Sequence, residues 1–103
     1  MKGRMRMRVS IVIPAYNAGN TLAACLDACV QQSQNSAEII VVDDGSTDDT
    51  AEVARSFAAE CLQQHHLGPA AARNKGWRMA HGEFVAFTDA DCIPRHDWIS
   101  KLL

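Results

Sequence analysis

The stretch that decides the fold is Ile39-Ile40-Val41-Val42-Asp43-Asp44, an apolar run that ends in two acids. The same order returns downstream in Phe84-Val85-Ala86-Phe87-Thr88-Asp89-Ala90-Asp91. Short apolar runs rich in β-branched and aromatic residues predict buried strands. Ligands of open α/β sheets bind outside the carboxyl ends of the strands. We therefore expect both acidic pairs at one edge of a sheet, facing a charged ligand that carries a metal.

The segments around these two runs predict strands that alternate with helices. Strands are expected at residues 9–14, 38–42 and 83–88, and the alternation implies an open, mostly parallel Rossmann-like α/β sheet with flanking helices. Apolar residues at helical spacing define a first helix through Leu22, Cys25, Leu26, Cys29 and Val30. A second helix is expected to start at Ser46 with Asp48 and Asp49 in its first turn.

The end of this second helix is ambiguous from the residues alone. Its apolar stripe consists of Ala54, Phe57, Ala58, Cys61 and Leu62, yet residues 60–64 fit a short edge strand equally well. A third helix is expected to open at Gly68-Pro69, because proline is favoured at the first helical position, and to end at Gly82. A terminal helix is expected from Pro94.

Length, charge and cysteine usage narrow the class of protein. With 103 residues and 48% hydrophobic content, the chain is expected to form one domain, and a net charge of −2 argues against a nucleic-acid partner. No signal peptide or membrane span is recognised, so a cytoplasmic location is expected. The start of the chain is basic, with Lys2, Arg4, Arg6 and Arg8. This segment is either a solvated end or a peripheral contact with anionic lipid at the inner face of the membrane. The four cysteines lack a C-x-x-C pattern and are interpreted as core thiols.

Two acidic elements carry the predicted chemistry. On an extended strand, Asp89 and Asp91 would share one face and hold a Mg²⁺ or Mn²⁺ ion together with substrate phosphates; the alternative is a helix cap or a solvated turn. Of Asp43 and Asp44, one is expected to cap the following turn. The other would point into the crevice and accept a base N–H. Ordinary turn chemistry is the alternative for this second pair.

Two further positions are candidates for contacts with the rest of a nucleotide. Arg73 on the third helix would reach ribose and phosphate, whereas Lys75 fits a solvated helix face equally well. Tyr16, just past the first strand, would offer an aromatic wall to a base, or else pack within a turn. The chain contains neither a P-loop nor a dinucleotide-binding glycine pattern.

Four motifs, at residues 9–17, 42–48, 68–76 and 82–91, stand in the order and spacing of family 2 glycosyltransferases. The chain resembles this family over essentially its whole length. The resemblance implies a GT-A nucleotide-diphospho-sugar transferase-like fold with a short strand ahead of Gly68. It also implies a divalent metal held by Asp91, with Asp89 at the ribose or a metal-bound water, and Asp44 at the base. The nucleotide pocket would be completed by Pro14, Tyr16 and Arg73.

The resemblance is to the donor-binding half of the family. Members continue into an acceptor-binding half that supplies the general base, and the only acid after Asp91 is Asp97. We therefore expect residues 1–103 to be a single, truncated donor domain without a catalytic base. It would bind a nucleotide-diphospho-sugar, with a UDP-sugar favoured, for inverting transfer to an acceptor hydroxyl. Alone it should be inactive and prone to self-association.

Two other classes of protein compete with this interpretation. A sugar nucleotidyltransferase would need a Gly-rich, basic loop after the first strand, where this chain has residues 15–19, Ala-Tyr-Asn-Ala-Gly. A non-enzymatic, Mg²⁺-binding receiver-like module would need more strands than the pattern predicts.

Overall fold

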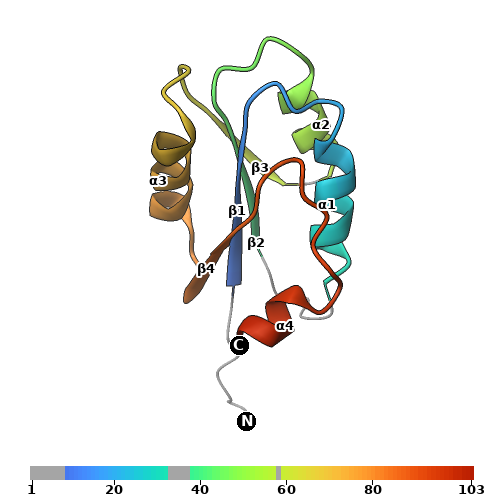
Figure 1. Ribbon diagram of the computed structural model, residues 1–103. Helices are drawn as coiled ribbons and strands as arrows, with labels where there is room; N and C mark the ends of the chain where they lie inside the picture. Colours follow the sequence, from blue (N-terminus) through green and yellow to red (C-terminus); the bar gives the residue numbers. More distant parts are fainter. Residues whose placement is uncertain (1–8, 33–37, 58) are drawn as a thin grey trace.

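The computed structural model describes residues 9–32, 38–57 and 59–103. In this part of the chain, four parallel strands form a sheet in the order β3-β2-β1-β4 (Figure 1). The strands are β1 (Val9–Ala15), β2 (Glu38–Asp43), β3 (Glu60–Gln63) and β4 (Phe84–Phe87). The helices are α1 (Leu22–Val30), α2 (Thr50–Ser56), α3 (Pro69–Met79) and α4 (Trp98–Leu102). The predicted open parallel α/β architecture is confirmed.

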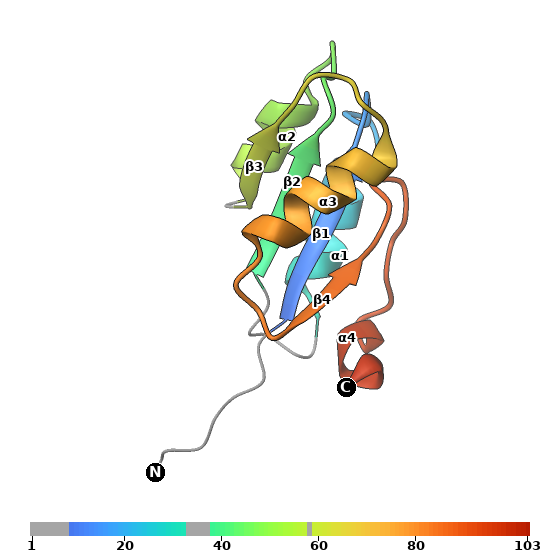
Figure 2. The same cartoon turned by 90° about the vertical axis from the view of Figure 1, so that its left-hand side faces the viewer.

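The sheet lies between two helical layers. Figure 2 shows α3 in front of one face, and Figure 1 shows α1 and α2 on the other. In the central strand β1, Ile11 and Ile13 pack in the core on the α1 side, whereas Val12 packs with Ala72 on the α3 side. Because both faces are covered, residues 11–13 of β1 and 39–42 of β2 are continuous apolar runs without polar alternation.

Helix α3 approaches the sheet closely because it carries a glycine at the contact. A Cβ atom at Gly76 would overlap the Cγ1 atom of Val12 in β1. Ala72, one turn earlier, is fully buried against the same face. With these two small residues turned towards the sheet, Arg73 and Trp77 lie on the side of α3 that borders β4.

The strand register brings the ends of the strands to one level. Ala15 at the end of β1 pairs with Asp43 of β2, which pairs in turn with Gln63 of β3. Strand β4 stops before this level: its last residue, Phe87, pairs with Val12, whereas β1 continues to Ala15. The residues that follow β4 therefore run beside the last part of β1 and reach the edge where the other strands end.

The second helix is shorter than its apolar stripe predicts. Helix α2 ends at Ser56, and Cys61 and Leu62 belong to β3, where they pair with Val41 and Val42. The continued helical spacing was misleading because Cys61 and Leu62, the adjacent middle residues of this short strand, are also partly buried, each against a different core cluster. The strand implied by the family resemblance is the correct alternative for residues 60–63. Ala58, the other predicted stripe member, lies outside the described residues.

Several other helix boundaries differ from those that the sequence predicts. Helix α2 begins at Thr50 rather than Ser46, and the residues before it contact the loop after β1, where the Ser46 hydroxyl accepts the backbone N–H of Asn17 at 2.8 Å. Val30, predicted on the apolar face of α1, is the last residue of that helix and is 54% exposed. Helix α3 ends at Met79, before Gly82, and α4 begins at Trp98, four residues after Pro94.

Among the described helices, none has both the length and the apolar content needed to cross a membrane. The basic residues that led us to expect a lipid contact fall outside the described residues, in the stretch 1–8. Membrane contact and a cytoplasmic location therefore stay predictions.

Candidate functional site

The loop after β1 is fastened to the loop after β2. The Asn17 side-chain oxygen accepts the Thr47 backbone N–H at 2.8 Å, and Asn17 itself has the left-handed backbone that asparagine tolerates. The Ala18 N–H donates to the Thr50 hydroxyl at 2.9 Å, and the Gly19 N–H donates to the Asp48 carboxylate at 2.9 Å. These contacts hold the first loop in place directly after Tyr16.

Asp43 is the acid that closes the turn after β2. Its Oδ1 accepts the Ser46 backbone N–H at 2.9 Å, and its Oδ2 accepts the Gln63 side-chain amide at 3.2 Å. Gly45, inside this turn, has a φ of +77°, a conformation that glycine adopts without steric cost. The expectation that one member of the pair caps the turn is confirmed, and Asp43 is that member.

Asp44 is buried and binds the loop between β3 and α3. Its Oδ1 accepts the Gln64 amide and the Leu67 backbone N–H, both at 2.8 Å. Its Oδ2 accepts the Gly68 N–H at 3.0 Å and lies 2.9 Å from Nδ1 of His66. An ionised carboxylate offers about four acceptor positions, and four groups already face this one.

The protonation of Asp44 reflects these partners. Burial by itself raises the pKa of the Asp44 carboxyl, since it penalises the charged form. Hydrogen bonds from Gln64, Leu67 and Gly68, together with the His66 ring, outweigh burial and lower the pKa below the ordinary aspartate value. Asp44 therefore stays ionised at neutral pH although it is almost fully buried.

A small pocket lies at the carboxyl edge of the sheet, as the positions of the acids predict. Its volume is about 200 Å³, and its lining consists of Pro14, Ala15, Tyr16, Asp44, His66, Pro69 and Asp89. Four residues predicted for nucleotide binding are thus brought together: Pro14, Tyr16, Asp44 and Asp89. The pocket is smaller than the roughly 300–1,000 Å³ usual for sites that enclose a whole drug-sized ligand.

His66 is a pocket residue that the sequence analysis missed. Its ring stacks on Tyr16 with the centroids 4.0 Å apart and the planes inclined by 26°. One face of Tyr16 is therefore covered by His66, and the predicted aromatic wall is in fact a stacked pair. The only signal for His66 was its place in the loop between β3 and Gly68, because no spacing rule singles out such a residue.

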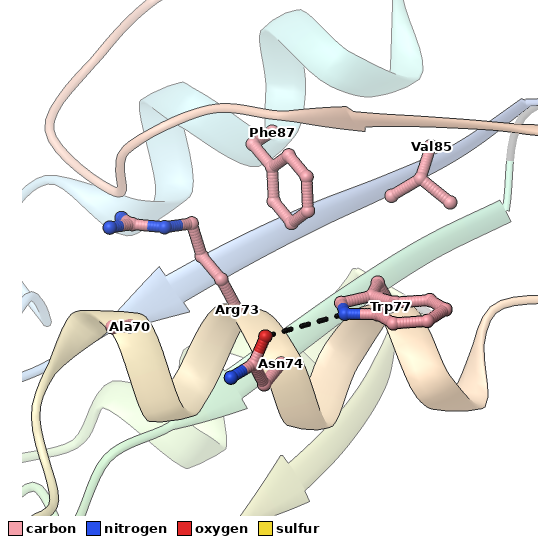
Figure 3. A pocket seen from close by; sticks show the side chains of 6 residues that line it. All are labelled: Ala70, Arg73, Asn74, Trp77, Val85 and Phe87. Carbon is pink, nitrogen blue, oxygen red and sulfur yellow. Dashed lines mark hydrogen bonds between the residues drawn. The ribbon is translucent and has the colours of Figure 1, made fainter.

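Arg73 lies outside this small pocket, in a neighbouring groove between α3 and β4. The groove has a volume of about 510 Å³ and is lined by Ala70, Arg73, Asn74, Trp77, Val85 and Phe87. Figure 3 shows the Arg73 guanidinium pointing away from both Phe87 and Trp77. The indole N–H of Trp77 donates to the Asn74 side-chain oxygen at 3.3 Å. Lys75 borders a third hollow with Gln64 and Leu67.

The second acidic pair lies on a turn, not on an extended strand. The Cys92 backbone N–H donates to the Asp89 carbonyl at 3.0 Å, which closes the turn after β4. One ligand atom each from Asp89, Asp91 and Cys92 lies within 4.8 Å of the other two. The prediction of a shared strand face was thus wrong, since the chain leaves the sheet at Phe87, but the turn still brings the carboxylates together.

The cysteines divide into two groups. Cys25 and Cys29 are buried in the core, as predicted, and Cys61 is half-buried. Cys92 is exposed beside the acids, so its interpretation as a core thiol was wrong. Taken without the thiol, the exposed carboxylates of Asp89 and Asp91 are hard oxygen donors that fit Mg²⁺ or Mn²⁺.

Comparison with solved structures defines the class of protein. The chain superposes on the crystal structure of S. aureus TarS 1–349 with a TM-score of 0.87 and 28% identity, covering 93% of this chain and 31% of that one. The mannosyltransferase PcManGT from Pyrobaculum calidifontis, solved with GDP-Man and Mn²⁺, matches with a TM-score of 0.82 and 32% identity over 89% of this chain and 30% of that one. These neighbours are GT-A glycosyltransferases, which confirms the predicted fold class.

The family follows from the sequence. Residues 10–103 match the model of glycosyl transferase family 2, and the chain belongs to this family. It is 39% identical over 89 residues to YibD of Escherichia coli (strain K12), described as an uncharacterized glycosyltransferase, covering 82% of this chain and 26% of YibD. The chain spans about a quarter to a third of these proteins. The nucleotidyltransferase and receiver-like alternatives receive no support from these matches.

Proposed function

We propose that this chain is the donor-binding domain of a glycosyltransferase, which binds a nucleotide-diphospho-sugar together with a divalent metal. The observation that carries the proposal is the shared pocket lined by Pro14, Tyr16, Asp44 and Asp89, with Asp91 on the adjoining turn. Related structures support the choice of ligand, since TarS has been solved with UDP and with UDP-GlcNAc.

In this proposal the base occupies the small pocket and the diphosphate extends towards the turn after β4. Asp44 would accept a base N–H. Because its acceptor positions are already occupied, either the Gln64 amide or the His66 ring must move aside for that bond. The ring of His66 is the easier group to displace, since it is more than half exposed and is held by only two short contacts and one stack.

Asp91 would hold the metal, and Asp89 would contact the ribose or a metal-bound water. When bound, the ion supplies charge neutralisation at the departing diphosphate, an effect worth several kcal/mol of barrier. The Asp89 and Asp91 carboxylates would orient it, and Arg73 in the adjacent groove would face the ribose and phosphates from α3. PcManGT, solved in complex with GDP-Man and Mn²⁺, supports the use of a divalent ion.

Transfer itself is proposed to be inverting and to need a general base that these 103 residues do not supply. Asp97, the only acid after Asp91 in the sequence, has its carboxylate 3.3 Å from Arg95 and 3.7 Å from Lys101. We expect the chain to bind a donor but to transfer sugar at a background rate, since general-base assistance typically contributes 10²–10⁴-fold. Ordinary turnover on any acceptor would contradict this, and Asp97→Asn would then be the first variant to examine.

The experiment that tests the ligand class is calorimetry against a panel of nucleoside diphosphates in Mn²⁺. UDP is expected to bind more tightly than the other members. Asp44→Ala should weaken UDP binding by about 1–3 kcal/mol, the cost of an unsatisfied partner. Asp43→Ala is the matched control and should weaken it less. If Asp43→Ala is the damaging change and Asp44→Ala is silent, the two acids have been assigned the wrong way round.

Strand β4 supports the expected self-association. It is an edge strand, yet Phe84 on one face and Phe87 on the other are exposed, and it carries no charged side chain. Edge strands usually carry charges or proline, whereas apolar residues on both faces are typical of interior strands. We propose that β4 of one copy pairs with β4 of a second copy, because antiparallel pairing of two identical strands is self-complementary. Sedimentation should detect dimers that Phe87→Lys disperses; a monomer at all accessible concentrations would contradict this.

A further inference from the structure

The turn after β4 presents three potential ligand atoms on a fixed backbone. Ala90, inside the turn, is buried in the core on the α1 side, while Asp89, Asp91 and Cys92 are exposed. The Asp89 carbonyl accepts the Cys92 N–H and lies 3.4 Å from Sγ of Cys25 in α1. The turn is therefore anchored both by its own hydrogen bond and by the helix behind it.

The thiol of Cys92 lies at a distance that suits a shared ion. Its Sγ is 3.9 Å from Oδ1 of Asp91, and the Asp89 carboxylate completes a group within 4.8 Å. Sulfur and oxygen ligands at about 2.3 Å and 2.1 Å from one tetrahedral ion stand roughly 3.6 Å apart. Small side-chain rotations would thus bring all three ligand atoms into one coordination sphere.

Of the four cysteines, all of which lie in the described residues, Cys92 is the exposed one. Cys25 and Cys29 are fully enclosed in the core. Cys61, in β3, is half-buried, and burial raises the pKa of its thiol, which keeps it protonated and a poor metal ligand. A metal–sulfur signal from the folded chain would therefore report Cys92.

We infer that Cys92 is a third protein ligand of the metal site, so that this turn binds thiophilic divalent ions such as Zn²⁺ or Co²⁺ more tightly than Mn²⁺ or Mg²⁺. The inference rests on the metal site proposed above for Asp89 and Asp91. Carboxylates alone favour Mg²⁺ and Mn²⁺, whereas a thiolate shifts preference towards softer ions. On binding, the sulfur gives its proton to solvent, as metal-bound thiols do.

The test is a Co²⁺ titration of the folded chain followed by absorption and calorimetry in parallel. The wild type should develop a near-ultraviolet sulfur-to-cobalt charge-transfer band, which oxygen ligands do not produce. Cys92→Ser should still bind Co²⁺ without the band. Its Zn²⁺ affinity should fall by at least the roughly 10-fold that loss of even an outer partner costs. Cys61→Ser is the matched control and should keep both the band and the affinity.

The outcomes separate this inference from the proposed function. Co²⁺ binding by the wild type without the band, or a band that persists in Cys92→Ser, would overturn the role of Cys92 while leaving the carboxylate site intact. Failure of the wild type to bind any divalent ion, with or without UDP, would remove the metal site itself and the proposed function with it. Because Cys92 is exposed, its replacement should leave the fold unchanged, which circular dichroism checks.

Discussion

The two acidic pairs at the carboxyl edge of the sheet are alike in sequence and opposite in environment. Asp43 and Asp44 are almost fully buried, and protein donors face both of their carboxylates. Asp89 and Asp91 are exposed, and in the described part of the chain the hydrogen bond to either carboxylate is the weak one that the Cys92 thiol donates to Asp91. The comparison shows that Asp43 and Asp44 hold loops together, whereas the carboxylate oxygens of Asp89 and Asp91 are available to a cation.

The largest expected effect on stability is that of Asp44→Ala. The substitution removes the acceptor for the Leu67 and Gly68 backbone N–H groups and for the Gln64 amide. Each buried donor left without a partner lowers the free energy of unfolding by about 1–3 kcal/mol. Water can reach part of this loop and satisfy some of the donors, so the total loss should correspond to one or two unsatisfied groups. The free energy of unfolding, measured by urea denaturation, should fall by about 2–4 kcal/mol.

Asp43→Ala is the matched control within the buried pair. Its carboxylate accepts hydrogen bonds from the Ser46 backbone and the Gln63 amide, so fewer donors are left unsatisfied. The loss of unfolding free energy should be about half that for Asp44→Ala. An equal or larger loss would show that the turn after β2, rather than the loop after β3, depends most on this pair.

A smaller effect should appear as a dependence of stability on pH. The pKa of Asp44 is lowered in the folded chain, so its ionised form stabilises the fold above the ordinary aspartate pKa of 3.8, and this contribution is lost as the pH falls through the lower folded value. The stability difference between wild type and Asp44→Asn should be constant from pH 5 to 7 and shrink below about pH 4. A difference that grows on acidification would contradict the sign.

The smallest effect on stability is expected for the exposed pair. Asp89→Ala and Asp91→Ala remove no hydrogen bond from a buried donor, and surface substitutions of this kind usually change stability by less than about 0.5 kcal/mol. Thermal or urea unfolding of the two variants should match the wild type. A loss as large as that for Asp44→Ala would remove the contrast between the two pairs.

Much of the fold could be predicted because apolar runs mark its buried strands and turn residues mark the ends of these strands. The runs at residues 9–14 and 38–42 became β1 and β2 within a residue or two, and both acidic pairs fell at the predicted edge. Residues 60–63 could not be assigned from periodicity, because a half-buried edge strand and a helix end place similar residues at similar spacing. Only pairing with β2, a tertiary contact, decides between them.

The positions of the acids in the candidate site could be predicted from the sequence, but those of its loop residues could not. His66 and Cys92 owe their positions to turns, whose geometry depends on hydrogen bonds to Asp44 and Asp89 from residues distant in sequence or across the turn. Arg73 was correctly placed on the third helix, but the close packing of α3 at Gly76 turns it towards the β4 groove. Such side-chain directions follow from packing rather than from spacing.

The central claim is that the exposed acids bind the metal that a nucleotide diphosphate needs, and calorimetry of UDP with Mn²⁺ and with excess chelator tests it most directly. Wild-type chain should bind UDP in Mn²⁺ and lose that binding in chelator, while Asp91→Ala, folded and equally stable, should bind weakly in both. Equal affinity of the wild type for UDP in Mn²⁺ and in chelator would contradict the metal role of Asp91 and with it the account of this site.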